Sequence, residues 1–183
     1  EGRSGLPYSY VYSTDLNLDG FTQNDTLAVP NGATDSRFDF SGMNAATQTA
    51  YFAYLKSSGL DKYAGGYAPR NSFIGAWQNR LDLHFSQDVK VTGPVHVEAF
   101  MDFINFGNFI SKSTFNYIEE LGNPNNSNQT VVLGGATYAA DGRIKPTASL
   151  NSDGTLVIPT ASQFLPNNGD SRWRIQAGVR LKF

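Results

Sequence analysis

The chain of 183 residues contains no cysteine and few charged residues. Without cysteine it can form no disulfide framework, and it offers no thiolate for catalysis or metal binding. Charged residues make up 16% of the sequence and the formal net charge is -2 at pH 7, so we expect no nucleic-acid partner. The G-x-S-x-G, H-E-x-x-H and phosphate-loop motifs are missing as well. We therefore predict no catalytic residues and a protein that is not an enzyme.

Long hydrophobic runs are also missing. No apolar run approaches the roughly 20 residues of a membrane-spanning helix. The opening stretch, EGRSGLPYSYVY, lacks the basic and apolar regions of a signal peptide, and we interpret it as the start of a processed or partial chain. A membrane β-barrel stays open as an interpretation, because barrel strands alternate apolar and polar residues and build no continuous apolar run.

Four segments do alternate apolar and polar residues with the period of two that is typical of a half-exposed strand. They cover residues 6–12, 79–91, 95–109 and 171–183. Three of them reach the roughly 9–11 residues that a tilted transmembrane strand needs. In the last one, SRWRIQAGVRLKF, one face carries Trp173, Ile175, Ala177, Val179, Leu181 and Phe183.

The connections between these segments are very unequal. The tripeptide TGP at 92–94 is a tight turn, whereas residues 13–78 and 110–170 form two long connections. Outer-membrane barrels have short turns on one side and long loops on the other, and structureless loops of this size are rare in compact soluble domains. We therefore predict an all-β fold, in which the chain supplies the C-terminal strands and two long extracellular loops of a transmembrane antiparallel β-barrel. The alternative is a soluble β-sandwich with the apolar faces in its core.

The barrel interpretation assigns an environment to each face of the strands. Apolar faces would contact lipid, and polar faces would line a wet lumen with Asp82, His84, Asp88, Glu98, Asp102 and Arg174. Aromatic residues near strand ends would lie in the interfacial girdles: Tyr8, Tyr10, Tyr12, Trp77, Trp173 and Phe183.

Two local structures are expected inside the long connections. Residues 44–58 have the pattern of a short amphipathic helix that ends at Gly59. Residues 130–150 form a predicted hairpin with its turn at Asp141-Gly142, and residues 155–159 look like a further short strand. By their position over the pore mouth, helix 44–58 and hairpin 130–150 are the predicted gates or ligand contacts.

Four stretches together resemble the C-terminal end of TonB-dependent outer-membrane receptors, nearest to the Oar-like subfamily with a carboxypeptidase-regulatory-like domain. These stretches are residues 6–30, 60–89, 97–111 and 171–183, and they are spread over the whole chain. The resemblance implies a bacterial outer-membrane barrel of about 22 strands with a plugged lumen. It also implies energised movement of a ligand across that membrane.

The resemblance further implies partners. Four strands cannot close a barrel and open strand edges are not tolerated in lipid, so we expect the chain to be one part of a larger molecule. The expected partners are the rest of the barrel and its plug, outer-membrane lipid, an unidentified ligand, and TonB-ExbB-ExbD acting through the plug region. The alternative function is surface binding or adhesion by the large extracellular loops.

The stretch DLNLDGFTQND resembles an EF-hand-type calcium loop. Alternate oxygen ligands followed by a glycine match the first half of such a loop, but Thr26 stands where the terminal bidentate glutamate is expected. The alternative is a turn in which the same carboxylates accept hydrogen bonds from backbone N–H groups. The candidate ligands for a structural Ca²⁺ are Asp15, Asn17, Asp19, Phe21 through its carbonyl, Gln23 and Asp25.

The two histidines, His84 and His96, lie in the second and third predicted strands. A three-residue turn places His84 opposite Asp102, and we interpret the two as a solvated polar pair in a lumen. The same register places Asp88 opposite Glu98, with Lys90 expected to offset the repulsion between these two like charges.

Overall fold

The structure is a computed structural model that describes residues 1–115, 130–158 and 171–183. Its regular structure is mainly β-strand with few helices, in agreement with the predicted all-β class, and the described strands form no closed barrel. The chain divides into two compact units. Unit 1 contains Glu1–Gly5, Ala76–Glu120 and Phe164–Phe183, and unit 2 contains Leu6–Gly75 and Leu121–Gln163.

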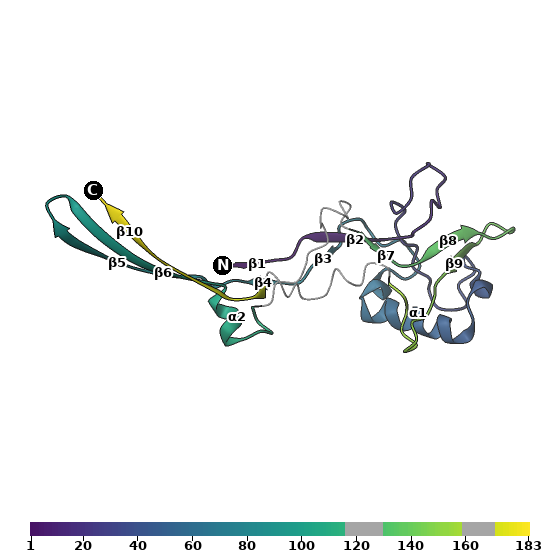
Figure 1. Ribbon diagram of the computed structural model, residues 1–183. Helices are drawn as coiled ribbons and strands as arrows, with labels where there is room; N and C mark the ends of the chain where they lie inside the picture. Colours follow the sequence, from purple (N-terminus) through teal and green to yellow (C-terminus); the bar gives the residue numbers. More distant parts are fainter. Residues whose placement is uncertain (116–129, 159–170) are drawn as a thin grey trace. The chain divides into compact units, whose positions relative to one another are not determined.

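Unit 1 contains a three-stranded antiparallel sheet in the order β10-β6-β5 (Figure 1). Strand β5 spans Leu83–Thr92, β6 spans Val95–Ile104 and β10 spans Arg174–Lys182. The turn between β5 and β6 uses Gly93, whose φ of +52° is accessible to glycine at little cost. The predicted strands 79–91, 95–109 and 171–183 are therefore confirmed in their central parts.

The predicted strand 95–109 is wrong beyond Ile104. Asn105 has a left-handed backbone with φ of +53°, and the chain continues as the short helix α2, Phe106–Ile110. The Asn105 N–H donates to Asp82 Oδ1 at 2.7 Å, and its side-chain Nδ2 donates to the Ser171 carbonyl at 2.7 Å. These two bonds stabilise a conformation that Asn tolerates better than most residues, and the alternation of residue types gave no sign of it.

The start of the second predicted strand is also interrupted. Residues 80–82 are outside the sheet, and β4, Gln78–Asn79, pairs instead with β1, Gly2–Arg3. Gly2 lies opposite Asn79 and Arg3 opposite Gln78 in this antiparallel pair. Unit 1 thus has a small second ladder next to the point where β5 begins.

Unit 2 contains the first predicted strand, and its environment differs from the prediction. β2, Pro7–Val11, is antiparallel to β3, Phe73–Ile74, and parallel to β7, Thr130–Val132. Tyr8, Tyr10 and Tyr12 are 9%, 3% and 0% exposed, so the prediction that they lie in an interfacial girdle is wrong. Both faces of β2 are buried, and a five-residue strand is too short to span a bilayer.

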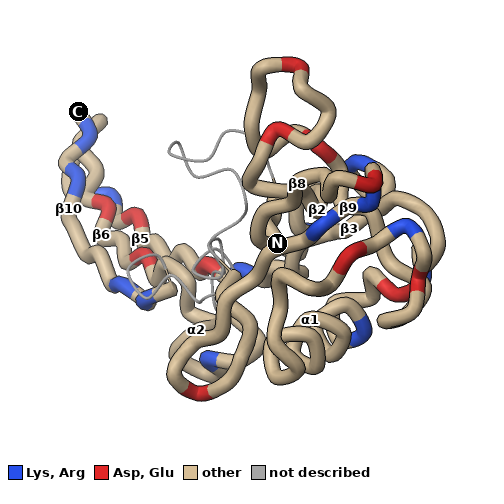
Figure 2. The backbone as a smooth tube through the Cα atoms, turned by 90° about the vertical axis from the view of Figure 1, so that its right-hand side faces the viewer, with Lys and Arg blue, Asp and Glu red and all other residues tan. Residues whose placement is uncertain are grey.

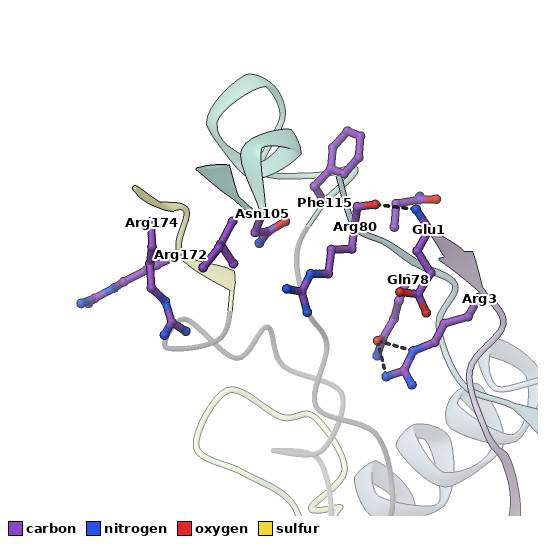
Figure 3. A pocket seen from close by; sticks show the side chains of 10 residues that line it. Glu1, Arg3, Gln78, Arg80, Asn105, Phe115, Arg172 and Arg174 are labelled. Atoms are coloured by element: carbon purple, nitrogen blue, oxygen red, sulfur yellow. Dashed lines mark hydrogen bonds between the residues drawn. The ribbon is translucent and has the colours of Figure 1, made fainter. Parts of the chain in front are cut away.

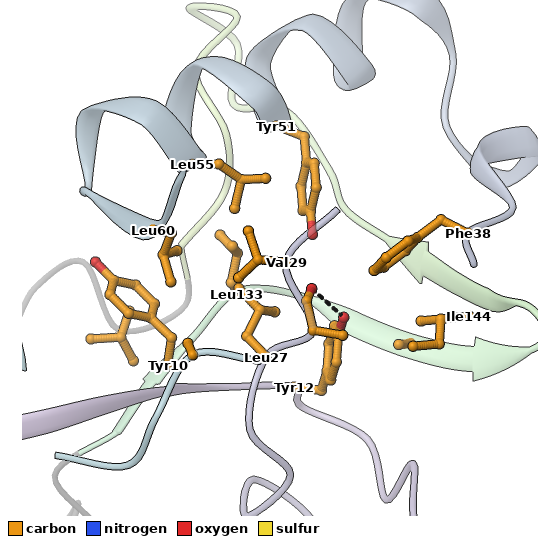
Figure 4. Packing of buried hydrophobic residues seen from close by; sticks show 14 of the residues in the cluster. Tyr10, Tyr12, Leu27, Val29, Phe38, Tyr51, Leu55, Leu60, Leu133 and Ile144 are labelled. Carbon is orange, nitrogen blue, oxygen red and sulfur yellow. Dashed lines mark hydrogen bonds between the residues drawn. The ribbon is translucent and has the colours of Figure 1, made fainter. Parts of the chain in front are cut away.

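A hydrophobic core holds unit 2 together (Figure 4). Helix α1, Ala45–Ser57, contributes Tyr51 and Leu55 to this core. Helix α1 confirms the predicted helix 44–58, with one residue fewer at each end. Asn44 caps its N-terminus, where Asn44 Oδ1 accepts the Thr47 N–H at 2.8 Å. Two 3₁₀ helices, Phe40–Gly42 and Leu60–Tyr63, flank α1 in sequence. Other buried members of the core are Leu27, Val29, Phe38, Leu60, Leu133 and Ile144.

The predicted hairpin at 130–150 is confirmed over a narrower range. β8, Gly135–Tyr138, pairs with β9, Ile144–Thr147, and the turn contains Gly142 with φ of +82°. The predicted short strand at 155–159 is wrong for its described part, where Leu156 makes only a single bridge to Leu150; residue 159 lies outside the described residues. The two long connections are therefore not open loops over their described residues, which contribute most of a compact unit with its own core.

Candidate functional site

Strands β5, β6 and β10 contain residues of both signs of charge (Figure 2). The register places the charged residues of the paired positions on one face of the sheet, the polar face. The register confirms that His84 lies opposite Asp102 and that Asp88 lies opposite Glu98. Side chains on this face come from alternate positions of all three strands: His84, Ser86, Asp88, Lys90, His96, Glu98, Phe100, Asp102, Gln176, Gly178, Arg180 and Lys182.

The repulsion between Asp88 and Glu98 is offset by the third strand. Lys182 Nζ lies 3.0 Å from Asp88 Oδ2 and 3.1 Å from Glu98 Oε2, and Arg180 Nη1 lies 3.2 Å from the same Glu98 oxygen. Lys90, which the sequence suggested for this role, makes no ion pair within the described residues. The compensation depends on β10, whose residues are more than 80 positions away in the chain.

Both histidines pair with carboxylates on this face. His84 Nδ1 lies 2.5 Å from Asp102 Oδ1, and His96 Nδ1 lies 2.7 Å from Asp88 Oδ1. The imidazoles are solvent-exposed, so each pair contributes little to stability. The structure therefore confirms that His84 and Asp102 form a solvated polar pair.

One glycine on the polar face is covered by an aromatic ring. Gly178 pairs with Phe100, and a Cβ added to Gly178 would lie 2.5 Å from Phe100 Cζ. The Arg180 guanidinium also lies over the Phe100 ring, with its Cζ 5.8 Å from the ring centroid, as a cation–π contact. This contact explains why one large apolar residue occurs among the charged positions of β6.

The opposite face of the same sheet is apolar and exposed. Every position on it is apolar except Gln87. Val179, in the middle of β10, is 72% exposed, and no described residue covers the face. The large exposed side chains of this face are Phe85, Val89, Val91, Met101, Ile175, Val179 and Leu181.

Aromatic rings gather at the end of this face where β10 begins. Helix α2 places Phe106 and Phe109 next to Trp173, with Phe109 and Trp173 centroids 5.5 Å apart. Phe183, beyond the other end of β10, is 92% exposed, and Trp77 in the same unit is also exposed. The contacts form one continuous series: Phe85–Phe103, Phe103–Phe106, Phe106–Phe109 and Phe109–Trp173.

In the predicted calcium loop, the first carboxylates bind backbone N–H groups. Asp15 accepts from the Asp19 and Gly20 N–H groups at 3.1 and 2.8 Å, and Asn17 Oδ1 also accepts from Asp19 at 3.0 Å. Asp19 accepts from the Phe21 N–H at 2.8 Å, and this bond lowers the pKa of the Asp19 carboxyl. These bonds are those of the Asx-rich turn that was the alternative interpretation.

The last predicted ligand, Asp25, lies buried beneath the loop. Its Oδ2 accepts the Leu16 and Asn17 N–H groups at 2.5 and 3.0 Å, while Gln23 has a left-handed backbone with φ of +60°. Among the residues that the structure describes, no three histidine or acidic side chains form a metal-binding group. A calcium loop also uses amide and carbonyl oxygens, so Ca²⁺ binding by these six residues stays a prediction.

A cavity of about 560 Å³ lies in unit 1, next to the first residue of β10 (Figure 3). Arg3, Arg80, Arg172 and Arg174 all line it, and they come from three separate stretches of the chain. Arg80 pairs with Asp82 at 2.7 Å, which lowers the pKa of that carboxyl. The other lining residues are Glu1, Gln78, Asn79, Ile104, Asn105 and Phe115.

Sequence reasoning identified only Arg174 of these four arginines as a lumen residue. Arg172 and Arg174 are two positions apart in the predicted strand 171–183, whose alternation places both on its polar face, although β10 begins only at Arg174. Arg3 and Arg80 are brought to the site by the β1-β4 ladder. The predicted ligand contacts, α1 and the β8-β9 hairpin, belong to unit 2 and do not line this cavity.

Comparison of the chain with protein-family models, with curated proteins and with solved structures finds no match. In the described part of the chain, no helix has the length and hydrophobicity that crossing a membrane requires.

Proposed function

We propose that unit 1 is part of the wall of a bacterial outer-membrane β-barrel, and that the chain is the C-terminal part of a TonB-dependent transporter that moves a ligand across that membrane. The observation that carries this proposal is the exposed apolar face of the β5-β6-β10 sheet, with aromatic rings at both of its ends. The transport activity rests on the resemblance to TonB-dependent receptors.

The apolar face is unusual for a protein surrounded by water. Soluble monomers rarely expose a contiguous apolar patch of more than a few hundred Å², and such patches mark surfaces that something covers. In a soluble β-sandwich a second sheet would pack on this face about 10 Å away. The described residues supply no such sheet, since Val179 and Leu181 are largely exposed. Lipid is the covering that requires no second sheet.

The spacing of the aromatic residues favours lipid over a protein partner. Trp173 and Phe183 are ten residues apart on an extended strand, which corresponds to about 33 Å along the strand. At a strand tilt of about 40° this is about 25 Å along the membrane normal, the height of the apolar band of outer-membrane barrels. The strand lengths of 9 and 10 residues match the same membrane thickness.

The charged face and the sheet edges support the same proposal. A barrel lumen is wet, so the ion pairs of Lys182 and Arg180 with Asp88 and Glu98 would remain hydrated there. Strands β5 and β10 lie at the two edges of the sheet. In lipid these edges would have to pair with further strands, which the rest of the barrel would supply. A plug in that barrel and TonB-ExbB-ExbD are the other proposed partners.

The second candidate function is surface binding or adhesion. Unit 2 favours it, because the residues predicted to be extracellular loops form a compact unit with its own hydrophobic core. A rigid unit of this kind can present a fixed binding surface. Binding of TonB separates the two candidates: the full-length protein, extracted in mild detergent, should retain purified TonB C-terminal domain if it is a transporter. A protein that is in the outer membrane and fails to retain TonB would favour adhesion.

Tryptophan quenching by brominated lipids tests the membrane proposal directly. The chain contains two tryptophans, so Trp77→Phe leaves Trp173 as its only one. In the full-length protein, any further tryptophans are replaced by phenylalanine. We expect lipids brominated near the headgroup to quench Trp173 more than lipids brominated near the bilayer centre. An unquenched Trp173, with the protein in the soluble fraction after cell lysis, would refute the proposal.

A further inference from the structure

We infer that the free edge of β5 pairs with the segment that directly precedes Glu1 in the full-length protein, in the antiparallel register that the β1-β4 ladder sets. This inference rests on the proposed function in one respect, namely that the chain is the C-terminal part of a longer polypeptide. The register itself comes from the structure of unit 1.

The β1-β4 ladder extends as far as Glu1. In both pairs of the ladder, the two residue numbers add up to 81. One step further, the Glu1 nitrogen donates to the Arg80 carbonyl at 2.7 Å, and the Arg80 N–H donates to the Glu1 carbonyl at 2.8 Å. The first of these bonds is drawn in Figure 3. Two residues that exchange both bonds form a hydrogen-bonded pair of an antiparallel ladder, so the same register still holds at Glu1 and Arg80.

The ladder is directed along β5. Only residues 80–82 separate β4 from β5, and the alternation of polar and apolar residues continues through them without a change of phase. Figure 1 shows the N-terminal end of β1 directed towards the β5-β6-β10 sheet. Strand β6 already occupies one edge of β5, and the other edge is free within the described residues. A segment that continues the ladder before Glu1 can therefore pair only with this free edge.

The faces of the β1-β4 ladder agree with those of the sheet. Alternate residues of the ladder, Glu1, Arg3, Gln78 and Arg80, line one cavity together with Arg174. Arg174 lies on the polar face of the sheet, two positions before Gln176. The Arg3 guanidinium also donates to Gln78 Oε1 at 3.0 and 3.3 Å, which fixes these two side chains on the same face. The polar face therefore continues from β5 into the ladder.

The register assigns a partner to each residue of the preceding segment. The third residue before Glu1 lies opposite Leu83, and the tenth lies opposite Lys90. Residues at odd distances from Glu1 share the apolar face with Phe85, so we expect them to be apolar. Residues at even distances share the polar face with His84, so we expect them to be polar. The segment would cover a strand edge that is otherwise open to pairing with other chains.

Disulfide formation in outer-membrane fragments tests the register in the full-length protein. The described chain contains no cysteine, and any cysteine elsewhere in the protein is replaced by serine. Ser86→Cys is combined with a cysteine at each of the fourth to eighth positions before Glu1. After oxidation with copper phenanthroline, the disulfide-linked tryptic peptides are quantified by mass spectrometry. We expect the sixth position to give at least about fivefold more linked peptide than the others, because only its Cβ lies directly opposite residue 86.

The fifth and seventh positions are matched controls, since their side chains point to the other face of the sheet. A second series with Gln87→Cys keeps the test valid if the first variant fails to fold. In that series the maximum should move to the seventh position.

Three outcomes separate this inference from the barrel proposal. A maximum at the fourth or eighth position for Ser86→Cys would refute the register. Equal or absent linkage at every position, in a protein that is in the outer membrane, would reject the pairing and leave the barrel proposal standing. The expected linkage in a protein that is found in the soluble fraction would support the pairing and refute the barrel proposal.

Discussion

Replacing Val179 by arginine tests which medium covers the apolar face of unit 1. Val179 is 72% exposed and belongs to the face that we propose contacts lipid. It lies four residues from Phe183 and six from Trp173. With about 3.3 Å per residue and a tilt of about 40°, these separations are about 10 Å and about 15 Å along the membrane normal. Val179 therefore lies close to the middle of the proposed apolar band.

The expected cost follows from that depth. An arginine on the lipid face of an outer-membrane barrel destabilises the protein by about 2–4 kcal/mol at the bilayer midplane and by about 0–1 kcal/mol near the interface. Val179→Arg should therefore lower the free energy of unfolding by about 2–4 kcal/mol. Leu181→Arg, two residues closer to the end of the strand, should cost about 1 kcal/mol. In water, a substitution at such an exposed position would stay within about 0.5 kcal/mol.

The measurement is urea-dependent unfolding of the full-length protein in phosphatidylcholine vesicles, followed by tryptophan fluorescence. Gln176→Arg is the matched control, because it adds the same charge to the same strand on the polar face, opposite Asp102. We expect Gln176→Arg to change the free energy of unfolding by less than about 0.5 kcal/mol.

Two results would refute the reasoning. If Val179→Arg leaves the free energy of unfolding unchanged, the apolar face meets water. If Val179→Arg and Leu181→Arg are equally and strongly destabilising, the face is covered by protein along its length, because a protein core has no gradient of depth like that of a bilayer.

Three further predictions concern interactions within each of the two units. Arg37 holds the pKa of the Asp35 carboxyl well below its usual value of about 3.9. The ionised Asp35 therefore stabilises unit 2 at every pH above about 3.9, and this contribution is lost as the pH falls from there towards the lowered pKa of the folded state. Asp35→Asn should reduce the acid sensitivity of the urea midpoint, read from the near-ultraviolet circular dichroism of the tyrosines. Tyr51→Phe should raise the free energy of unfolding by about 1 kcal/mol, since its buried hydroxyl has no hydrogen-bond partner among the described residues; a loss of stability would contradict this. Gly178→Ala should lower the free energy of unfolding by about 1–3 kcal/mol, because the added methyl group clashes with the Phe100 ring. In a double-mutant cycle, the variant that combines Gly178→Ala with Phe100→Ala should be at least about 0.5 kcal/mol more stable than the sum of the two single effects predicts.

Much of the sheet in unit 1 could be predicted from local sequence. The short turn at Gly93 brings β5 and β6 together, and the alternation then assigns each residue to a face. The sequence therefore predicts that His84 lies opposite Asp102, and the register confirms it. The pairing of β10 with β6 could not be predicted in this way, because no short turn joins the two strands. The ion pairs of Lys182 with Asp88 and Glu98 depend on that pairing, so they could not be predicted either.

Other features depended on conformations or surroundings that residue types do not reveal. The alternating tyrosines of β2 have the same pattern as a half-exposed strand, yet both faces of β2 are buried in unit 2. Asn105 continues an alternating run, yet its left-handed backbone ends β6 and starts α2. The calcium-loop pattern is equally compatible with an Asx-rich turn, because the same carboxylates accept backbone N–H groups.

The sequence by itself determined the alternating faces of β5, β6 and β10, the helix that begins after Asn44 and the hairpin turn at Gly142, because each follows from spacing and conformational preference within a few residues. Only the tertiary structure decided which strands pair, which tyrosines are buried and which arginines meet around one cavity. These features join residues that are far apart in the chain, and such contacts depend on the burial and packing of whole units rather than on any local pattern.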